Sequence, residues 1–130
     1  MVSVGGWTGS LYYSTAVGSP ANRTAFVKTV TSLATQYNLD GIDFEYVSPI
    51  FLPNLLVVNS RLISSWEYPG TQGIGCNTIN PDDTSNFVAF LKELREDPVG
   101  KNLILTAATS VFPWVGPDGN RLTEIGRAHV

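Results

Sequence analysis

The sequence is poor in cysteine, histidine and charge. One cysteine, Cys76, and one histidine, His129, stand among its 130 residues, and only 15% of the residues are charged. A lone cysteine cannot cross-link the chain to itself, and this pair supplies too few ligands for a Cys/His zinc site. The sequence therefore excludes a disulfide scaffold and such a zinc centre, and we expect neither a metal nor another cofactor.

Basic residues and long apolar runs are also scarce. Eight Lys and Arg residues against eleven Asp and Glu residues give a net charge of -3, with no basic stripe for phosphates or anionic lipids. The longest apolar runs are far too short to cross a bilayer. These absences argue against nucleic-acid and membrane partners, and nothing in the pattern indicates an obligate protein partner.

Apolar residues make up 43% of the chain, which is enough to build the core of one domain. Short β-prone runs at 2–4, 39–44 and 103–108 predict three strands. Helical spacing of apolar residues predicts one amphipathic helix over 20–37 and another that begins at Pro81. The chain thus alternates strand, helix, strand, helix and strand.

Both predicted helices begin at a proline that follows a capping residue. Ser19 precedes Pro20, and Asn80 precedes Pro81. We expect Asp82 and Asp83 to favour the start of the second helix through its dipole, and not to act in catalysis. The expected buried faces are Phe26, Val30, Leu33, Ala34 and Tyr37 in the first helix, and Phe87, Phe90, Leu91 and Leu94 in the second. Residues 7–18 are expected to form a polar, aromatic loop.

Alternating strands and helices predict an α/β fold with a parallel sheet. Three strands cannot close a barrel, and a (β/α)8 barrel needs about 250 residues. The sheet is therefore open or most of a barrel is absent. Because Met1 stands in the middle of a predicted strand, we expect the chain to be a fragment.

Two carboxylates, Asp40 and Asp43, interrupt the apolar pattern of the second strand. Acids at the carboxyl ends of parallel strands converge on a shared pocket in a barrel. A second carboxylate two residues away from one of these acids on the strand would face the same pocket. The repulsion between the two carboxylates would then separate their pKa values. Such a pair can divide acid and base roles.

Four segments in this order resemble the chitinases of glycoside hydrolase family 18, especially the fungal type. They are Ser3-Val4-Gly5-Gly6-Trp7, Asp40-Gly41-Ile42-Asp43-Phe44, Trp66-Glu67-Tyr68-Pro69 and Leu105-Thr106-Ala107-Ala108. The resemblance covers nearly all of 2–44 and 66–120. It implies a partial TIM barrel, about strands three to five of the (β/α)8 fold, from a secreted, extracellular enzyme.

The resemblance also implies a chemistry, the retaining and substrate-assisted hydrolysis of β-1,4-N-acetylglucosamine linkages in chitin. Glu67 would protonate the glycosidic oxygen, and Asp43 would share a proton with the next aspartate of the motif. Asp40 is out of phase with these acids and would support the strand end. Gly6, Trp7 and Tyr68 would contact the sugar, whereas Tyr12, Tyr13 and Trp114 are expected to serve in core or loop packing.

Residues 45–65 interrupt the family motif, which requires Asp-Trp-Glu-Tyr-Pro directly after Phe44. Codons for Glu45-Tyr46-Val47 can contain a splice donor, Leu62-Ile63 can carry a branch site, and Ser65-Trp66 can contain an acceptor. Removal of this segment in frame would restore an aspartate before Trp66. We therefore expect 45–65 to be a translated intron.

The last seven residues, 124–130, match the translation of a sequencing adapter and include His129. We expect them to be a non-native tail on an incomplete catalytic domain that spans 1–123. Asn22-Arg23-Thr24 matches an N-glycosylation acceptor, which has meaning only if the parent protein is secreted, and chance often produces such triplets.

Three functions remain open at this point. If the motif is aligned without a gap, Glu45 takes the place of its aspartate and Val47 that of its catalytic acid. If residues 45–65 are looped out, Glu67 takes the place of the acid but the aspartate is missing. Neither alignment gives a complete catalytic site, so this chain, with 45–65 present, is expected to be inactive. The parent protein is expected to be a chitinase or, as alternatives, an endo-β-N-acetylglucosaminidase or a non-catalytic, lectin-like oligosaccharide-binding relative.

Overall fold

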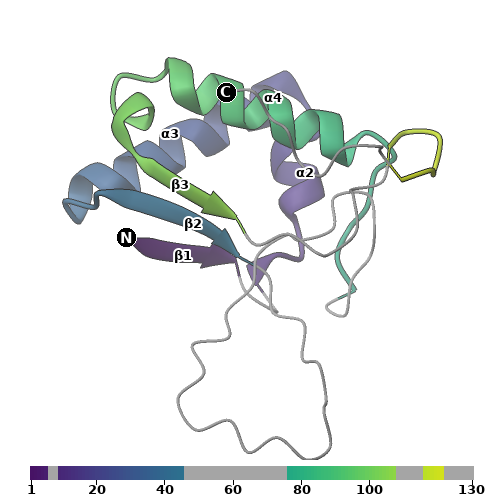
Figure 1. Ribbon diagram of the computed structural model, residues 1–130, viewed down its shortest axis with the longest axis horizontal. Helices are drawn as coiled ribbons and strands as arrows, with labels where there is room; N and C mark the ends of the chain where they lie inside the picture. Colours follow the sequence, from purple (N-terminus) through teal and green to yellow (C-terminus); the bar gives the residue numbers. More distant parts are fainter. Residues whose placement is uncertain (6–8, 46–75, 108–115, 122–130) are drawn as a thin grey trace, which may run out of the picture.

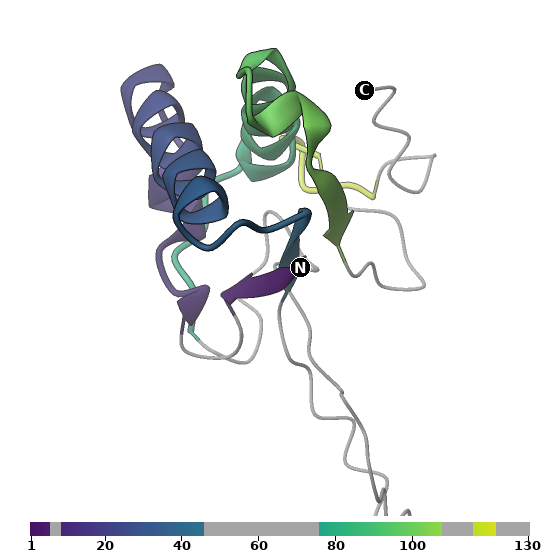
Figure 2. The same cartoon turned by 90° about the vertical axis from the view of Figure 1, so that its left-hand side faces the viewer.

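The computed structural model describes residues 1–5, 9–45, 76–107 and 116–121. Its elements follow one another as β1 (Val2–Gly5), α2 (Tyr13–Val17), α3 (Pro20–Gln36), β2 (Gly41–Glu45), α4 (Asp83–Glu96), the 3-10 turn η1 (Gly100–Asn102) and β3 (Ile104–Ala107). The helices lie together on one face of a small sheet (Figure 1). Viewed from the side, α3 and α4 run next to each other above the strands (Figure 2).

The three strands form a parallel sheet in the order β1-β2-β3. Val2 pairs with Ile42 on one side of β2, and Gly41 pairs with Ile104 on the other side. The parallel α/β architecture predicted from the sequence is confirmed. The sheet is open, because among the described residues each outer strand pairs with β2 alone.

Helix α3 starts as its sequence predicts. The backbone N–H of Asn22 donates to Ser19 Oγ at 3.2 Å, and Pro20 occupies the first turn, where a missing N–H costs nothing. Val30 and Ala34 are buried as expected. Tyr37 is not, since the helix ends at Gln36 and the Tyr37 side chain is 62% exposed. The prediction that Tyr37 belongs to the buried face is therefore wrong.

The expected loop over 7–18 is also wrong in part, because it contains the short helix α2. Tyr13 and Val17 lie one helical turn apart, and both are buried. The Tyr13 hydroxyl donates to the carbonyl oxygen of Val4 at 2.6 Å. Helix α2 is thus attached to β1 and closes one end of the core.

Helix α4 begins two residues later than the predicted start at Pro81. Asn80 Oδ1 accepts a hydrogen bond from Asp82 N at 2.9 Å, so 80–82 form a side-chain-supported turn ahead of the helix. Asp83 Oδ2 accepts from Asn80 N at 2.8 Å, and the Asp83 side chain is fully buried. Both acids lie at the helix start as predicted, Asp82 at the N-cap position and Asp83 in the first turn, although the helix itself spans Asp83–Glu96.

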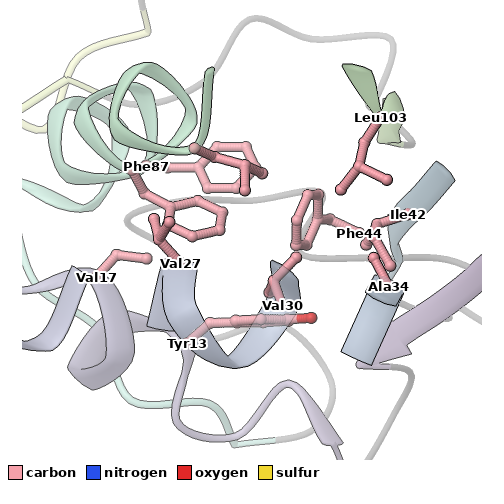
Figure 3. Packing of buried hydrophobic residues seen from close by; sticks show 11 residues of the cluster. Tyr13, Val17, Val27, Val30, Ala34, Ile42, Phe44, Phe87 and Leu103 are labelled. Carbon is pink, nitrogen blue, oxygen red and sulfur yellow. The ribbon is translucent and has the colours of Figure 1, made fainter. Parts of the chain in front are cut away.

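Aromatic rings from α2, β2 and α4 fill the space between the layers (Figure 3), and Phe26 of α3 packs against them. The Phe44 ring meets the edge of Phe90 with centroids 5.4 Å apart, and Phe26 stacks on Phe90 at 4.8 Å. Ile42 and Phe44 are 0% and 1% exposed, which fixes the face of β2 that turns to the helices. Alternation along the strand therefore places Asp43 on the opposite face.

No helix in the described ranges is both long and apolar enough to span a membrane.

Candidate functional site

A row of three polar side chains crosses the sheet at the level of Asp43. Ser3 on β1 and Thr106 on β3 are the register partners of Asp43 on its two sides. The Ser3 hydroxyl donates to Asp43 Oδ2 at 3.1 Å, and the Thr106 hydroxyl donates to Asp43 Oδ1 in a short hydrogen bond. Both carboxylate oxygens therefore accept a hydrogen bond. We name Ser3, Asp43 and Thr106 the strand row.

The strand row lies on the face of the sheet that the helices leave uncovered. Ser3 and Thr106 are exposed and Asp43 is half-buried, whereas Ile42 and Phe44 are buried beneath the helices. Thr106 Oγ1 also lies 4.0 Å from the sulfur of Met1, a second contact on this face. Asp43 thus stands in the middle of the central strand, with a hydroxyl on each side.

Tyr13 connects this row electrostatically to the core. Burial raises the pKa of the Tyr13 phenol well above its ordinary value, and the negative charge of Asp43 raises this pKa further. Tyr13 therefore stays neutral at physiological pH and keeps its proton for the carbonyl oxygen of Val4. This bond attaches α2 to β1, the strand that carries Ser3.

The two predicted acids of the second strand stand apart in the structure. Asp43 is within β2, whereas Asp40 precedes its first residue, Gly41, at the amino end of the strand. Asp40 is exposed, and its backbone carbonyl accepts a hydrogen bond from Ile104 N at 2.9 Å. This backbone contact ties the start of β2 to β3, and Asp40 lies apart from the strand row.

The other predicted site residues, Gly6, Trp7, Glu67 and Tyr68, lie outside the described residues. Trp114 and His129 do so as well. Of the remaining aromatic residues, Tyr13 is 6% exposed and packs in the core as predicted, whereas Tyr12 is 65% exposed.

Sequence reasoning did not assign a role to Ser3 or Thr106, although it placed both on strands. The available signal was a hydroxyl residue on each flanking strand beside a strand acid. This signal becomes specific only with the register, because a shift by one residue would turn each hydroxyl to the other face. The described residues contain no cluster of three His, Cys, Asp or Glu side chains that could hold a metal ion.

Comparisons with known proteins give the strand row a context. Residues 1–127 match the family described as glycosyl hydrolases family 18. A chitinase-like effector from Moniliophthora perniciosa is 40% identical over 124 residues, which are 95% of this chain and 24% of the relative. Probable chitinase 2 from Drosophila melanogaster is 35% identical over 127 residues, which are 97% of this chain and 21% of the relative.

The fold is shared with a solved structure. A chitinase from Rhizomucor miehei superimposes with a TM-score of 0.72 at 30% identity, over 98% of this chain and 34% of that one. The chain thus spans about a fifth to a third of the length of these relatives. The open sheet of β1, β2 and β3 with its helices is part of the (β/α)8 barrel of such enzymes.

Proposed function

The chain belongs to glycosyl hydrolase family 18, and from this premise we propose that its parent protein hydrolyses β-1,4-N-acetylglucosamine linkages in chitin. The observation that carries the proposal is the strand row. A carboxylate fixed at both oxygens by hydroxyls of two neighbouring strands is positioned before substrate arrives, so little reorganisation is needed. In a barrel, this uncovered face of the sheet turns to the interior, below the pocket at the carboxyl ends of the strands.

The proposed chemistry is retaining and substrate-assisted. Glu67 donates a proton to the glycosidic oxygen as that bond breaks, while the acetamide oxygen of the substrate attacks the anomeric carbon. Glu67 then activates the water that opens the resulting ring. An aspartate directly before Trp66 orients the acetamide, and Asp43 lies below that aspartate and shares a proton with it. Gly6, Trp7 and Tyr68 form part of the sugar-binding surface.

We propose that residues 45–65 are a translated intron and that 124–130 are a non-native tail on an incomplete catalytic domain at 1–123. Glu45 is the last residue of β2 and pairs with Gly5, so the position two residues beyond Asp43 holds a glutamate where the family motif has aspartate. If the motif is read straight on from Asp43, Val47 occupies the position of the proton donor. If 45–65 are looped out, Glu67 returns as the proton donor but no aspartate precedes Trp66. Neither alternative gives a complete site. We expect the chain to be inactive.

The messenger RNA of the source organism tests this assignment directly. Sequencing across the codons of Phe44 and Trp66 should show an aspartate codon in place of the codons for 45–65. A mature message that retains the whole segment would overturn the intron assignment.

Chitin or N-acetylglucosamine oligosaccharides are the proposed ligands, and the parent protein is proposed to be secreted. The same motif would suit an endo-β-N-acetylglucosaminidase that acts on N-linked glycan cores. A second candidate function, oligosaccharide binding without hydrolysis, is favoured by a specific observation, since one relative at 40% identity is named a chitinase-like effector.

One experiment separates these candidates. In the restored enzyme, a single aspartate replaces residues 45–65 and the rest of the full-length protein is present. We expect this protein to cleave chitin oligosaccharides, and we expect Glu67→Gln to lower the rate by on the order of a hundredfold to ten-thousandfold while binding is retained. Binding without hydrolysis by the restored enzyme itself would identify the non-catalytic relative, and cleavage of N-glycan cores alone would identify the glucosaminidase.

A further inference from the structure

The triplet Asn22-Arg23-Thr24 is the only Asn-x-Ser/Thr sequence with a non-proline middle residue in the chain. The proposed hydrolysis of chitin makes no use of it. It lies in the first turns of α3, in the helix layer and away from the sheet face that carries the strand row (Figure 2). Whether the folded domain can carry a glycan at this position depends on which side chains of the triplet are exposed and which are packed.

The three side chains of the triplet divide between solvent and the core of the helix pair. Asn22 is exposed, whereas the Arg23 side chain turns toward α4 and is only 12% exposed. Arg23 Nε lies 3.0 Å from Glu93 Oε1, and Arg23 also donates to the carbonyl oxygen of Val17 at 2.8 Å. The long middle side chain is thus held away from Asn22 and leaves its amide open to solvent.

The Asn22 amide has a hydrogen to spare for modification. Its Nδ2 donates one hydrogen to the carbonyl oxygen of Thr15 at 2.8 Å. A side-chain amide has two hydrogens, and an N-linked sugar replaces one of them. One N–H therefore remains as a donor after the sugar is attached, so modification leaves Asn22 a donor for Thr15 at the corner between α2 and α3.

Thr24 also suits this use of the triplet. Its hydroxyl reaches Glu93 Oε2 at 3.3 Å in the folded domain, and this hydroxyl is the group that an acceptor triplet requires. Thr24 is exposed, and its bond to Glu93 forms only when α3 packs on α4. In the unfolded chain entering the secretory pathway, the hydroxyl is therefore free to meet the transferase.

We propose that Asn22 is an N-glycosylation site. In the transfer, Asn22 Nδ2 forms a bond to the anomeric carbon of a lipid-pyrophosphate-linked oligosaccharide and loses one proton to the transferase. The bond between that carbon and the pyrophosphate oxygen breaks, and the lipid pyrophosphate leaves with the electron pair. The inference rests on the secretion included in the proposed function, and it is independent of the hydrolysis of chitin.

The test uses the whole chain fused behind a cleavable signal peptide in a yeast secretory host. Mass spectrometry is applied, in cell extract and medium together, to chains that have lost the signal peptide and have therefore entered the pathway. We expect an added mass that peptide N-glycosidase F removes, mapped to Asn22. Thr24→Ser should keep this glycan because it keeps the hydroxyl, and Thr24→Val should abolish it.

Signal-cleaved chains without the added mass would overturn the proposal, as would a glycan that persists in Thr24→Val. The assay involves no chitin, so inactivity of the restored enzyme and absence of the glycan are separate results.

Discussion

The carboxylate of Asp43 is held by side chains from the strands on both sides of its own. Its own strand supplies the side chain, and the hydroxyls of Ser3 and Thr106 arrive from the strands on either side. Each partner reaches it only because the register pairs both residues with Asp43. The position of one acid therefore depends on the correct pairing of the whole sheet.

Thr106→Val tests this dependence in the restored enzyme. The substitution keeps the shape of the side chain and removes the hydroxyl that donates to Asp43 Oδ1. Because a loosened catalytic group spends less time in its productive geometry, we expect kcat/KM for chitin oligosaccharides to fall by roughly tenfold to a hundredfold. Thr106→Ser is the matched control, since it keeps the hydroxyl and should keep most of the activity. Equal activity of the Thr106→Val variant and the unsubstituted restored enzyme would contradict a positioning role for Thr106.

Tyr13 provides a test by pH. Its pKa in the folded chain is raised by burial and then by the charge of Asp43, whereas the unfolded chain titrates near the ordinary value of about 10. The folded state therefore holds the phenol proton more tightly. The stability that this proton provides is fully present below about pH 10 and is lost as the pH rises beyond it. We expect the free energy of unfolding to decline there by up to about 1.4 kcal/mol per pH unit from this group.

Urea unfolding of the parent chain and Tyr13→Phe between about pH 9 and 11 measures this effect. Tyr13→Phe should be less stable at neutral pH by about 1 kcal/mol, because it lacks the hydrogen bond to Val4, and its pH dependence should be shallower. Tyr12→Phe, at a position that is 65% exposed, should keep the steep decline. If the free energy of unfolding changed with pH in the same way for Tyr13→Phe and for the unsubstituted chain, Tyr13 would not contribute to the pH dependence.

Elements with regularly spaced apolar residues or a clear helix-capping residue could be predicted from the sequence. Helix α3 follows from Ser19, Pro20 and its apolar stripe, and β2 follows from the apolar residues around Asp43. Helix α2 was missed because two buried apolar residues, Tyr13 and Val17, make too short a pattern to separate a single turn of helix from a loop. Its other buried residue, Ser14, gives no apolar signal.

The candidate site was predictable in part for a related reason. Asp43 stands out as an acid within a buried strand, and the motif around it is specific. Its partners Ser3 and Thr106 are small polar residues of a common type, far away in the sequence, and only strand register brings them to the same level. Asp40 lies three residues before Asp43 and is out of phase with it, as predicted from the sequence, and in the structure it precedes the first residue of β2.

The turn from α4 into β3 depends on a glycine. Gly100 is buried, and a Cβ added there would overlap the backbone oxygen of Leu94 and lie 2.8 Å from Leu94 Cδ1. Asp97 Oδ1 accepts hydrogen bonds from Val99 N and Gly100 N at 2.8 and 3.0 Å, so the turn has little freedom to move. The close approach of η1 to the end of α4 sets where β3 begins.

Gly100→Ala should therefore destabilise the chain by about 1–3 kcal/mol through overpacking. Gly9→Ala is the matched control, because a Cβ at Gly9 would meet nothing within 4 Å. Urea denaturation measures both variants against the parent chain. A Gly100→Ala variant as stable as Gly9→Ala would mean that the turn relaxes freely.

The open sheet is one sector of a larger architecture. The chain matches 34% of the length of the Rhizomucor miehei chitinase, and its helices cover only one face of the three strands. Met1 and Ile104 on the other face are 66% and 59% exposed. In the barrel of the relatives, this face turns to the interior, so the strand row acquires its surroundings only when the remaining strands are in place.

The most direct test of this account is the initial rate at which the full-length protein cleaves chitin oligosaccharides, measured with and without residues 45–65. We predict hydrolysis by the restored enzyme and, with the segment retained, a rate lower by on the order of a hundredfold or more, because the acid and the orienting aspartate are no longer placed together above Asp43. Equal rates from the two proteins, or no hydrolysis by either, would contradict it.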